Sequence, residues 1–279
     1  MLELWAINTK EVYMLKAILF DLDHTLIDWS EAESWDTFLR RRFDPVWDFV
    51  HENMHPLYDA TAEDMQVSFS FMLRTAWRIG TRTLIAPNFL YVLRETLTTI
   101  GVSPEQVDVP EIMRIFDWQP MQGERAYPDA LEVLPQLAAQ GVELGLVTNA
   151  SAPMRYRDQE LAAFDLLGYF PRCRIAATEV GYLKPHRAIF QRALELLGVA
   201  PHEVVFVGDN LEADIKGAQQ AGMVAVLRAH EGVVDEWASD APEITPDGTI
   251  HTLHELPALL DGWFPGWRHN GRNGHGGAA

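Results

Sequence analysis

The chain of 279 residues has a single cysteine, few basic residues and no long hydrophobic run. Cys173 cannot form a disulfide within the chain, which is typical of a reducing compartment. Lys and Arg number 22 against 40 Asp and Glu, and the net charge of -18 disfavours a nucleic-acid backbone as a partner. No apolar run approaches the ~18–20 residues that span a bilayer, and the N-terminus lacks a signal-peptide pattern. We therefore expect a cytoplasmic protein that binds neither nucleic acid nor a membrane.

The composition is that of a folded protein with a large core. Hydrophobic residues make up 48% of the chain and aromatic residues 10%, which argues against disorder. The first predicted strand begins after Met14, so residues 1–13 are expected to be an N-terminal extension. From Trp263 onward Gly, Asn, His and Arg dominate, and residues 263–279 are therefore predicted to be a disordered tail.

Most of the chain alternates between short apolar runs and amphipathic segments. Predicted strands cover residues 15–20, 142–147, 174–177, 204–207 and 224–227. Predicted helices cover residues 129–139, 153–167, 186–197 and 211–221. This alternation indicates the α/β class, with a doubly wound parallel sheet and helices on both faces. Ligands of such sheets bind at the carboxyl ends of the strands, where Asp21, Thr148 and Asp209 fall.

Between the first strand and residue 118 the pattern is helical instead. Met65, Phe69, Met72, Ala76 and Ile79 recur at helical spacing, and Ser30 with Glu33 resembles a capping box at the start of the block. We therefore expect residues 30–118 to form a helical cap domain inserted into a core domain of residues 14–29 and 119–262. Such an insertion would lie over the site as a lid.

Asp21 and Asp23 stand two residues apart, directly after the first predicted strand. Carboxylates this close repel each other, so the pair indicates a bound cation or phosphoryl group. An ordinary turn is the alternative. A calcium loop is excluded, because that motif needs an acid or amide at Thr25 and a glycine at Leu26.

Three further short motifs follow this pair along the chain. In order, the motifs are Asp21-x-Asp23-x-Thr25, Thr148-Asn149, Lys184-Pro185, and Gly208-Asp209 with Asp214. Together they resemble the haloacid dehalogenase (HAD) superfamily over about residues 15–230, in the branch with a helical cap after the first motif. The resemblance implies a Rossmann-like core and a phosphatase-like hydrolase.

The resemblance also implies roles for the two acids of the first motif. Asp21 would be the nucleophile that forms an aspartyl-phosphate, and Asp23 the general acid and base. Mg²⁺ would be the cofactor, held by Asp21, Asp209 and the backbone carbonyl of Asp23.

The remaining motif residues would bind the phosphoryl group. The resemblance assigns the Thr148 hydroxyl, the Asn149 backbone N–H and the Lys184 ammonium to phosphate binding, and Asp214 to orienting Lys184 or a metal-bound water. Each also has a structural interpretation: a turn at Thr148 and Asn149, a surface lysine at Lys184, and a first-turn helix acid at Asp214.

The expected function is Mg²⁺-dependent hydrolysis of a small phosphorylated metabolite. Dehalogenases of this superfamily lack the second acid, so Asp23 favours phosphate chemistry. A sugar-phosphate mutase or other phosphotransferase, a 2-haloacid dehalogenase and a non-catalytic binding module are the alternatives. Arg74 and Arg78, one turn apart, and the run Arg40-Arg41-Arg42 either face solvent or bind an anionic substrate. Substrate identity and oligomeric state are not indicated by the sequence.

Overall fold

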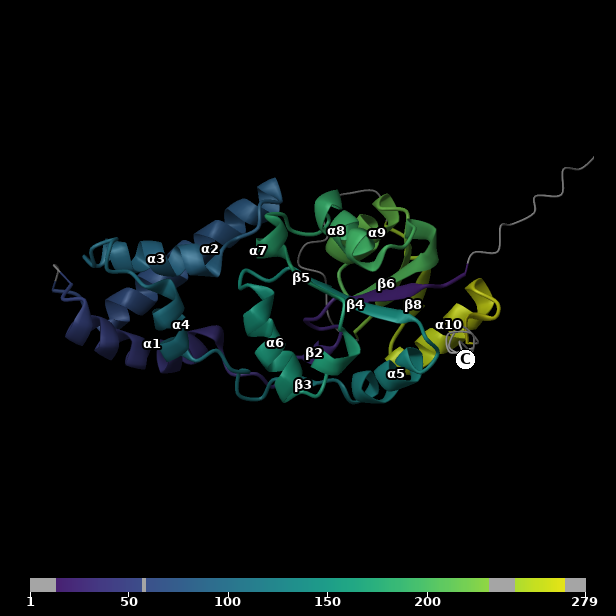
Figure 1. Ribbon diagram of the computed structural model, residues 1–279, viewed down its shortest axis with the longest axis horizontal. Helices are drawn as coiled ribbons and strands as arrows, with labels where there is room; N and C mark the ends of the chain where they lie inside the picture. Colours follow the sequence, from purple (N-terminus) through teal and green to yellow (C-terminus); the bar gives the residue numbers. More distant parts are fainter. Residues whose placement is uncertain (1–13, 57–58, 231–243, 269–279) are drawn as a thin grey trace, which may run out of the picture.

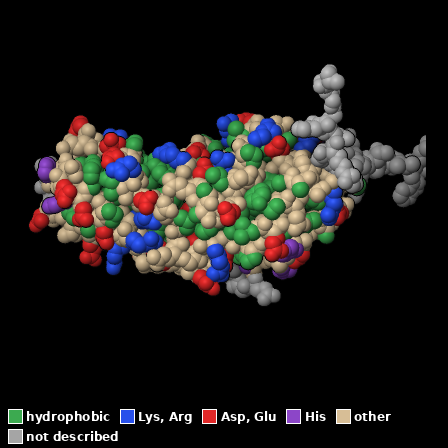
Figure 2. All heavy atoms as spheres, turned by 60° about the horizontal axis from the view of Figure 1, so that its bottom comes forward, with side chains coloured by type: hydrophobic (Ala, Val, Ile, Leu, Met, Phe, Trp, Pro, Cys, Tyr) green, Lys and Arg blue, Asp and Glu red, His purple; other side chains and the backbone are tan. Residues whose placement is uncertain are grey.

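The computed structural model describes residues 14–56, 59–230 and 244–268. These residues form an elongated molecule with a mainly helical half and an α/β half (Figure 1). Acidic and basic side chains are interspersed over the face drawn in Figure 2. The predicted extension of residues 1–13 lies outside the described residues.

A sheet in the order β5-β4-β1-β6-β7-β8 forms the centre of the α/β half, and all its pairings are parallel. Its strands are β1 (Ala17–Phe20), β4 (Glu143–Thr148), β5 (Cys173–Ala176), β6 (Val204–Gly208), β7 (Val224–Arg228) and β8 (Gly248–Ile250). Five of them lie where the sequence predicts strands. The three-residue edge strand β8 was not predicted.

Side chains of successive strand residues enter opposite cores, as the two-residue period of a strand requires. In β1, Ile18 and Phe20 join one buried cluster, whereas Ala17 and Leu19 join another. The first cluster is covered by α5 (Pro128–Ala138), α6 (Met154–Ala163) and α10 (Leu256–Trp263). The second is covered by α7 (Ala177–Val180), α8 (Arg187–Leu197) and α9 (Gly217–Gln220). The doubly wound arrangement is thus confirmed (Figure 1).

Short helical turns complete the core at the strand ends. The 3-10 turns are Leu167–Tyr169, Pro201–Glu203 and Leu253–Glu255, and a π-helical turn covers Leu211–Lys216. This π turn and α9 occupy the predicted helix of residues 211–221. Because the turn follows β6 directly, it brings Asp214 back toward the end of that strand.

The helical half is the predicted cap. It consists of α1 (Trp35–Asn53), α2 (Ala62–Thr83), α3 (Phe89–Thr99) and α4 (Val109–Phe116). Its own core is rich in edge-to-face aromatic pairs, such as Phe43 with Phe69 and Phe89 with Phe116. A two-stranded antiparallel ribbon of β2 (Ile27–Asp28) and β3 (Arg125–Ala126) joins cap and core.

Two details of the cap differ from the sequence predictions. Helix α1 is capped by Ser34, whose hydroxyl accepts from the Thr37 N–H at 3.1 Å, so the capping box at Ser30 and Glu33 is wrong. In α2, Met65 and Phe69 are buried as predicted, but Ile79 is 54% exposed. The last turns of α2 extend past the cap core toward the α/β half (Figure 1).

The C-terminal segment is packed through residue 268. Trp267 is 2% exposed, and its indole N–H donates to Asp261 Oδ1 at 2.8 Å. The rest of the tail predicted from residue 263 lies outside the described residues. Within the described ranges, no helix is both long and apolar enough to cross a membrane.

The close approach of β6 to the π turn gives a test of the fold. An added Cβ at Gly208 would lie 2.4 Å from Asp214 Cγ, whereas one at Gly262 meets nothing within 4 Å. We expect Gly208→Ala to lower the free energy of unfolding by about 1–3 kcal/mol, the usual cost of overpacking. Gly262→Ala, in a helix, should leave it unchanged or raise it by up to about 1 kcal/mol. Urea unfolding of both variants measures this, and equal stabilities would contradict it.

Candidate active site

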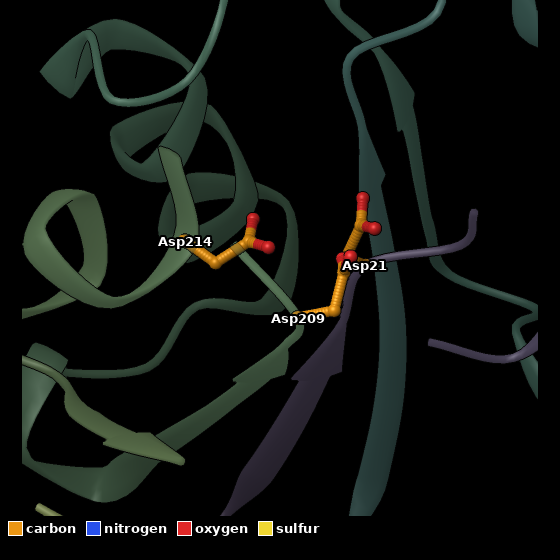
Figure 3. A group of neighbouring side chains, drawn as sticks. All are labelled: Asp21, Asp209 and Asp214. Atoms are coloured by element: carbon orange, nitrogen blue, oxygen red, sulfur yellow. The ribbon is translucent and has the colours of Figure 1, made fainter. Parts of the chain in front are cut away.

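The predicted site residues converge because β1 pairs with both β4 and β6. Phe20 lies opposite Leu146 on one side and Val207 on the other, so the three strands end close together. The Asp21 N–H donates to the Val207 carbonyl at 2.9 Å, which fixes the backbone just beyond β1. Figure 3 shows the carboxyl groups of Asp21, Asp209 and Asp214 gathered at these strand ends.

This acidic group could hold a metal ion. Asp21, Asp209 and Asp214 each offer a carboxylate oxygen, and these oxygens lie within 4.8 Å of one another. Burial raises the pKa of Asp21 well above its usual value, against the opposing charge of Lys184. Burial and the charge of Asp214 likewise raise the pKa of Asp209, to about 7. A bound cation would relieve this repulsion and restore the carboxylates.

Lys184 lies in the middle of the site. Its ammonium donates to Asp21 Oδ1 at 2.5 Å and to the Val147 carbonyl at 2.9 Å, and lies 2.7 Å from Asp214 Oδ1. Burial lowers the pKa of Lys184, but the two carboxylates outweigh burial and raise it above its usual value. The lysine is therefore charged and buried, which excludes the interpretation as a surface residue.

Asn149 and Asp214 hold this lysine in place. Asn149 Oδ1 accepts from the Lys184 N–H at 2.7 Å, and its amide donates to the Lys184 carbonyl at 3.3 Å. The other carboxylate oxygen of Asp214 accepts from the Asn210 N–H at 3.1 Å. With its two oxygens on Lys184 and Asn210, Asp214 suits the orienting role better than a direct role in metal binding.

Asp23, Thr25 and Thr148 lie beside the acidic group and Lys184. The Thr148 hydroxyl donates to Asp23 Oδ2 and the Thr25 hydroxyl to Asp209 Oδ1, both at 3.4 Å. The backbone of Thr25 is fixed by Arg228, whose guanidinium donates to the Thr25 carbonyl at 2.8 Å and also pairs with Asp129. The structure thus brings all the motif residues together.

A residue of this site that the sequence analysis missed is Arg157 on α6. The Arg157 side chain is 6% exposed, and its guanidinium donates to Asp23 Oδ1 at 2.5 Å and lies 3.0 Å from Glu160 Oε2. The indole of Trp118, at the end of the cap, donates to Glu160 Oε1 at 2.6 Å. A chain of contacts therefore links the cap to the proposed general acid. The sequence gives little signal for it, since Arg157 stands among Arg155 and Asp158 in what resembles a solvated charge run.

Two adjoining cavities lie between cap and core. One, of about 300 Å³, lies beside Asp23 and Arg157 and is lined by Trp29, Trp35, Trp77 and Trp118. The other, of about 1050 Å³, reaches Lys184. Arg74 and Arg78 face these cavities, whereas Arg41 and Arg42 pair with Glu33 and Asp117 within the cap region.

Comparison with models of known protein families identifies the family of this chain. The model of haloacid dehalogenase-like hydrolases matches residues 15–222. The chain belongs to this family. The predicted family, its α/β fold and its inserted helical cap are therefore confirmed, whereas the roles of single residues remain predictions.

Phosphatases are prominent among the relatives of this HAD-like hydrolase. It is 28% identical to the glyceraldehyde 3-phosphate phosphatase of Methanopyrus kandleri, over 87% of this chain and 96% of that protein. It is 30% identical to the ribulose-1,5-bisphosphate 5-phosphatase of Halopiger xanaduensis, over 88% of this chain and 100% of that one. These relatives confirm the prediction that the chain is a phosphatase-type enzyme.

Solved structures share the whole architecture. A HAD phosphatase from Thermococcus onnurineus superposes with a TM-score of 0.57 and 25% identity, covering 89% of this chain and 99% of the other. A 2-haloacid dehalogenase from Pseudomonas syringae superposes with a TM-score of 0.60 and 27% identity, covering 90% and 100%. The same fold therefore serves both phosphatases and dehalogenases, and only the site can separate them.

The central lysine gives a stability test. We expect Lys184→Met to cost about 3–5 kcal/mol of unfolding free energy, because Asp21 and Asp214 lose their buried counter-charge. The loss should be smaller at pH 5 than at pH 8, since the carboxyl groups can then take up protons. Lys216→Met, which removes a half-exposed partner of Glu212, is the control. An equal effect of both substitutions on chemical unfolding would contradict the buried-charge account.

The Arg157 network gives a pH test. Burial raises the pKa of Glu160 to about 8, against the attraction of Arg157. The fold therefore binds a proton that the unfolded chain releases above about pH 4.5, and this contribution to stability is lost as the pH rises through 8. We expect the unfolding free energy of Glu160→Gln to fall less between pH 5 and 8 than that of the native chain. Glu52→Gln, at an exposed position, should keep the native pH dependence; unchanged curves for both variants would refute the assignment.

Proposed function

We propose that the protein hydrolyses phosphomonoesters of small metabolites, with Mg²⁺ as cofactor and an aspartyl-phosphate as intermediate. The observation that carries this proposal is the buried Asp21 carboxylate held 2.5 Å from Lys184 at the end of β1, with Asp23 beside it. A nucleophile, a charge-neutralising cation and a second acid are what two-step phosphoryl transfer requires.

In the first step a carboxylate oxygen of Asp21 attacks phosphorus and the bond to the leaving oxygen breaks. Asp23 gives its proton to that oxygen, and the alcohol leaves. In the second step Asp23 takes a proton from water, whose oxygen attacks the phosphorus of the acyl phosphate. Inorganic phosphate departs and Asp21 is regenerated, so atoms and charge balance over the cycle.

The donor set fits a magnesium ion. Asp21 and Asp209 offer only oxygen ligands, which Mg²⁺ prefers, and burial together with neighbouring carboxylates raises the pKa of both, an effect that a bound cation would offset. We propose that these carboxylates and the Asp23 carbonyl hold the ion, while Asp214 stays with Lys184. When bound, the ion would offset the repulsion between carboxylate and phosphate.

The phosphoryl oxygens would be bound by donor groups that lie beside the two acids. The Thr148 hydroxyl lies against Asp23 and the Lys184 ammonium against Asp21, and the Asn149 backbone N–H is proposed as a third donor. Since the Asn149 side chain holds the Lys184 backbone, its substitution would also displace the lysine.

Asp23 favours a phosphatase over the dehalogenase with the same fold. A halide leaves without a proton, so a dehalogenase needs no acid at this position, whereas an alkoxide does. The test is a screen for phosphate released from many phosphomonoesters with Mg²⁺, run beside a chloride-release assay on 2-chloropropionate. Chloride release without phosphate release would overturn the proposal, and so would turnover of neither.

Substitution of each acid separates the two roles. Asp21→Asn should abolish turnover of every phosphomonoester, because the nucleophile is lost. Asp23→Asn should lower kcat about 10²–10⁴-fold on alkyl phosphates, whose leaving oxygen needs a proton. It should lower the phosphorylation rate much less on p-nitrophenyl phosphate, measured as the burst of nitrophenolate. Equal losses on the two substrates would contradict the role of Asp23 as an acid.

A further inference from the structure

One face of helix α2, which is mostly polar, lines the cavities between the cap and the core domain. The residues of α2 that line the two cavities are Ser70, Leu73, Arg74, Trp77, Arg78, Thr81 and Arg82. Their spacing alternates between three and one, so they form one continuous stripe along the helix. Arg74 and Arg78, for which the sequence left open whether they face solvent or an anionic substrate, therefore line the cavities between cap and core.

Three arginines of this stripe share one cavity with the catalytic lysine. Arg74, Arg78 and Arg82 line the 1050 Å³ cavity on the cap side, and Lys184 and Asn210 line it on the core side. Arg74 also lines the smaller cavity that holds Asp23. At 1.5 Å rise per residue the row extends about 12 Å along α2, leading away from Asp23.

The charges of this row are largely uncompensated. Arg74 lies 3.9 Å from Asp36, with both side chains about two-thirds exposed. Among the described residues, Arg78 and Arg82 form no ion pair through their guanidinium groups. Glu212 lines the same cavity, but its carboxylate pairs with Lys216 at 2.5 Å. Like charges four residues apart destabilise a helix, so a bound anion would stabilise this row.

We propose that Arg74, Arg78 and Arg82 bind a second anionic group of the substrate. The substrate class is then a phosphomonoester whose leaving group carries a further phosphate or carboxylate. The location of the scissile phosphate, between Asp21 and Lys184, rests on the proposed function. Guanidinium groups suit this task, because they bind phosphate and carboxylate oxygens in pairs and are always charged.

A binding experiment tests this without turnover. The full-length Asp21→Asn variant with Mg²⁺ is titrated calorimetrically with fructose 1,6-bisphosphate and with fructose 6-phosphate. A second pair, 3-phosphoglycerate and glycerol 3-phosphate, distinguishes a carboxylate from a phosphate. We expect the ligand with the extra anion to bind at least about tenfold more tightly in one or both pairs.

Adding Arg78→Gln and Arg82→Gln to this variant should reduce the affinity ratio to about two or less. Glutamine keeps the helix propensity, and the loss of like charges should not lower the unfolding temperature. Arg94→Gln, an exposed arginine on α3 outside both cavities, is the matched control and should keep the ratio. As a second measurement, Arg78→Glu alone should lower the ratio further than Arg78→Gln.

Equal affinities within both pairs would overturn the proposal, as would a ratio that survives the double substitution or binding of none of the four ligands. Phosphate release from p-nitrophenyl phosphate by the unsubstituted protein tests the proposed function separately. Turnover of that substrate with no preference for a second anion would leave the hydrolase intact and remove only this specificity.

Discussion

The site depends on the contact between Lys184 and the two carboxylates of Asp21 and Asp214. These groups come from three different elements, and each is nearly inaccessible to water. Burial alone would drive the acids to take up protons and the lysine to lose its own. Together they keep a charged lysine 2.5 Å from the proposed nucleophile. The parallel pairing of β1 with β4 and β6 provides this meeting point, and the Asn149 side chain holds the lysine loop against it.

A second buried cation, Arg157, links the site to the cap. Arg157 contacts Asp23 on one side and Glu160 on the other, and Trp118 donates to Glu160 where the cap chain returns to the core. The proposed acid is therefore positioned by residues on both sides of the β2–β3 ribbon. Trp118, Glu160 and Arg157 thus form a continuous line of contacts from the end of the cap to Asp23.

The sequence allowed the sheet and the motif residues to be predicted, because both depend on local signals. Apolar runs such as Val204–Val207 and glycines such as Gly198 mark strands and helix ends without reference to the rest of the molecule. Arg157 and the cavity-facing side of α2 depend instead on which surface packs against which. A charged helical residue has the same local pattern whether it meets Asp23 or water. The Met65–Ile79 stripe identified the cap-facing side near Met65, yet it failed at Ile79, where α2 has passed beyond its partner helices.

The distribution of positive charge explains how so acidic a protein could accept a phosphorylated ligand. At long range the net charge repels anions, so attraction must come from cations within a Debye length of the cleft. Lys184 and Arg157 form ion pairs with Asp21 and Asp23, so these two cations add little net positive charge to the site. The arginines of α2 are not engaged in this way, and they lie on the cap rather than on the core. If these arginines bind substrate as proposed, chemistry and recognition lie on separate domains, and a ligand with two anionic groups would hold the two domains together through its own charges.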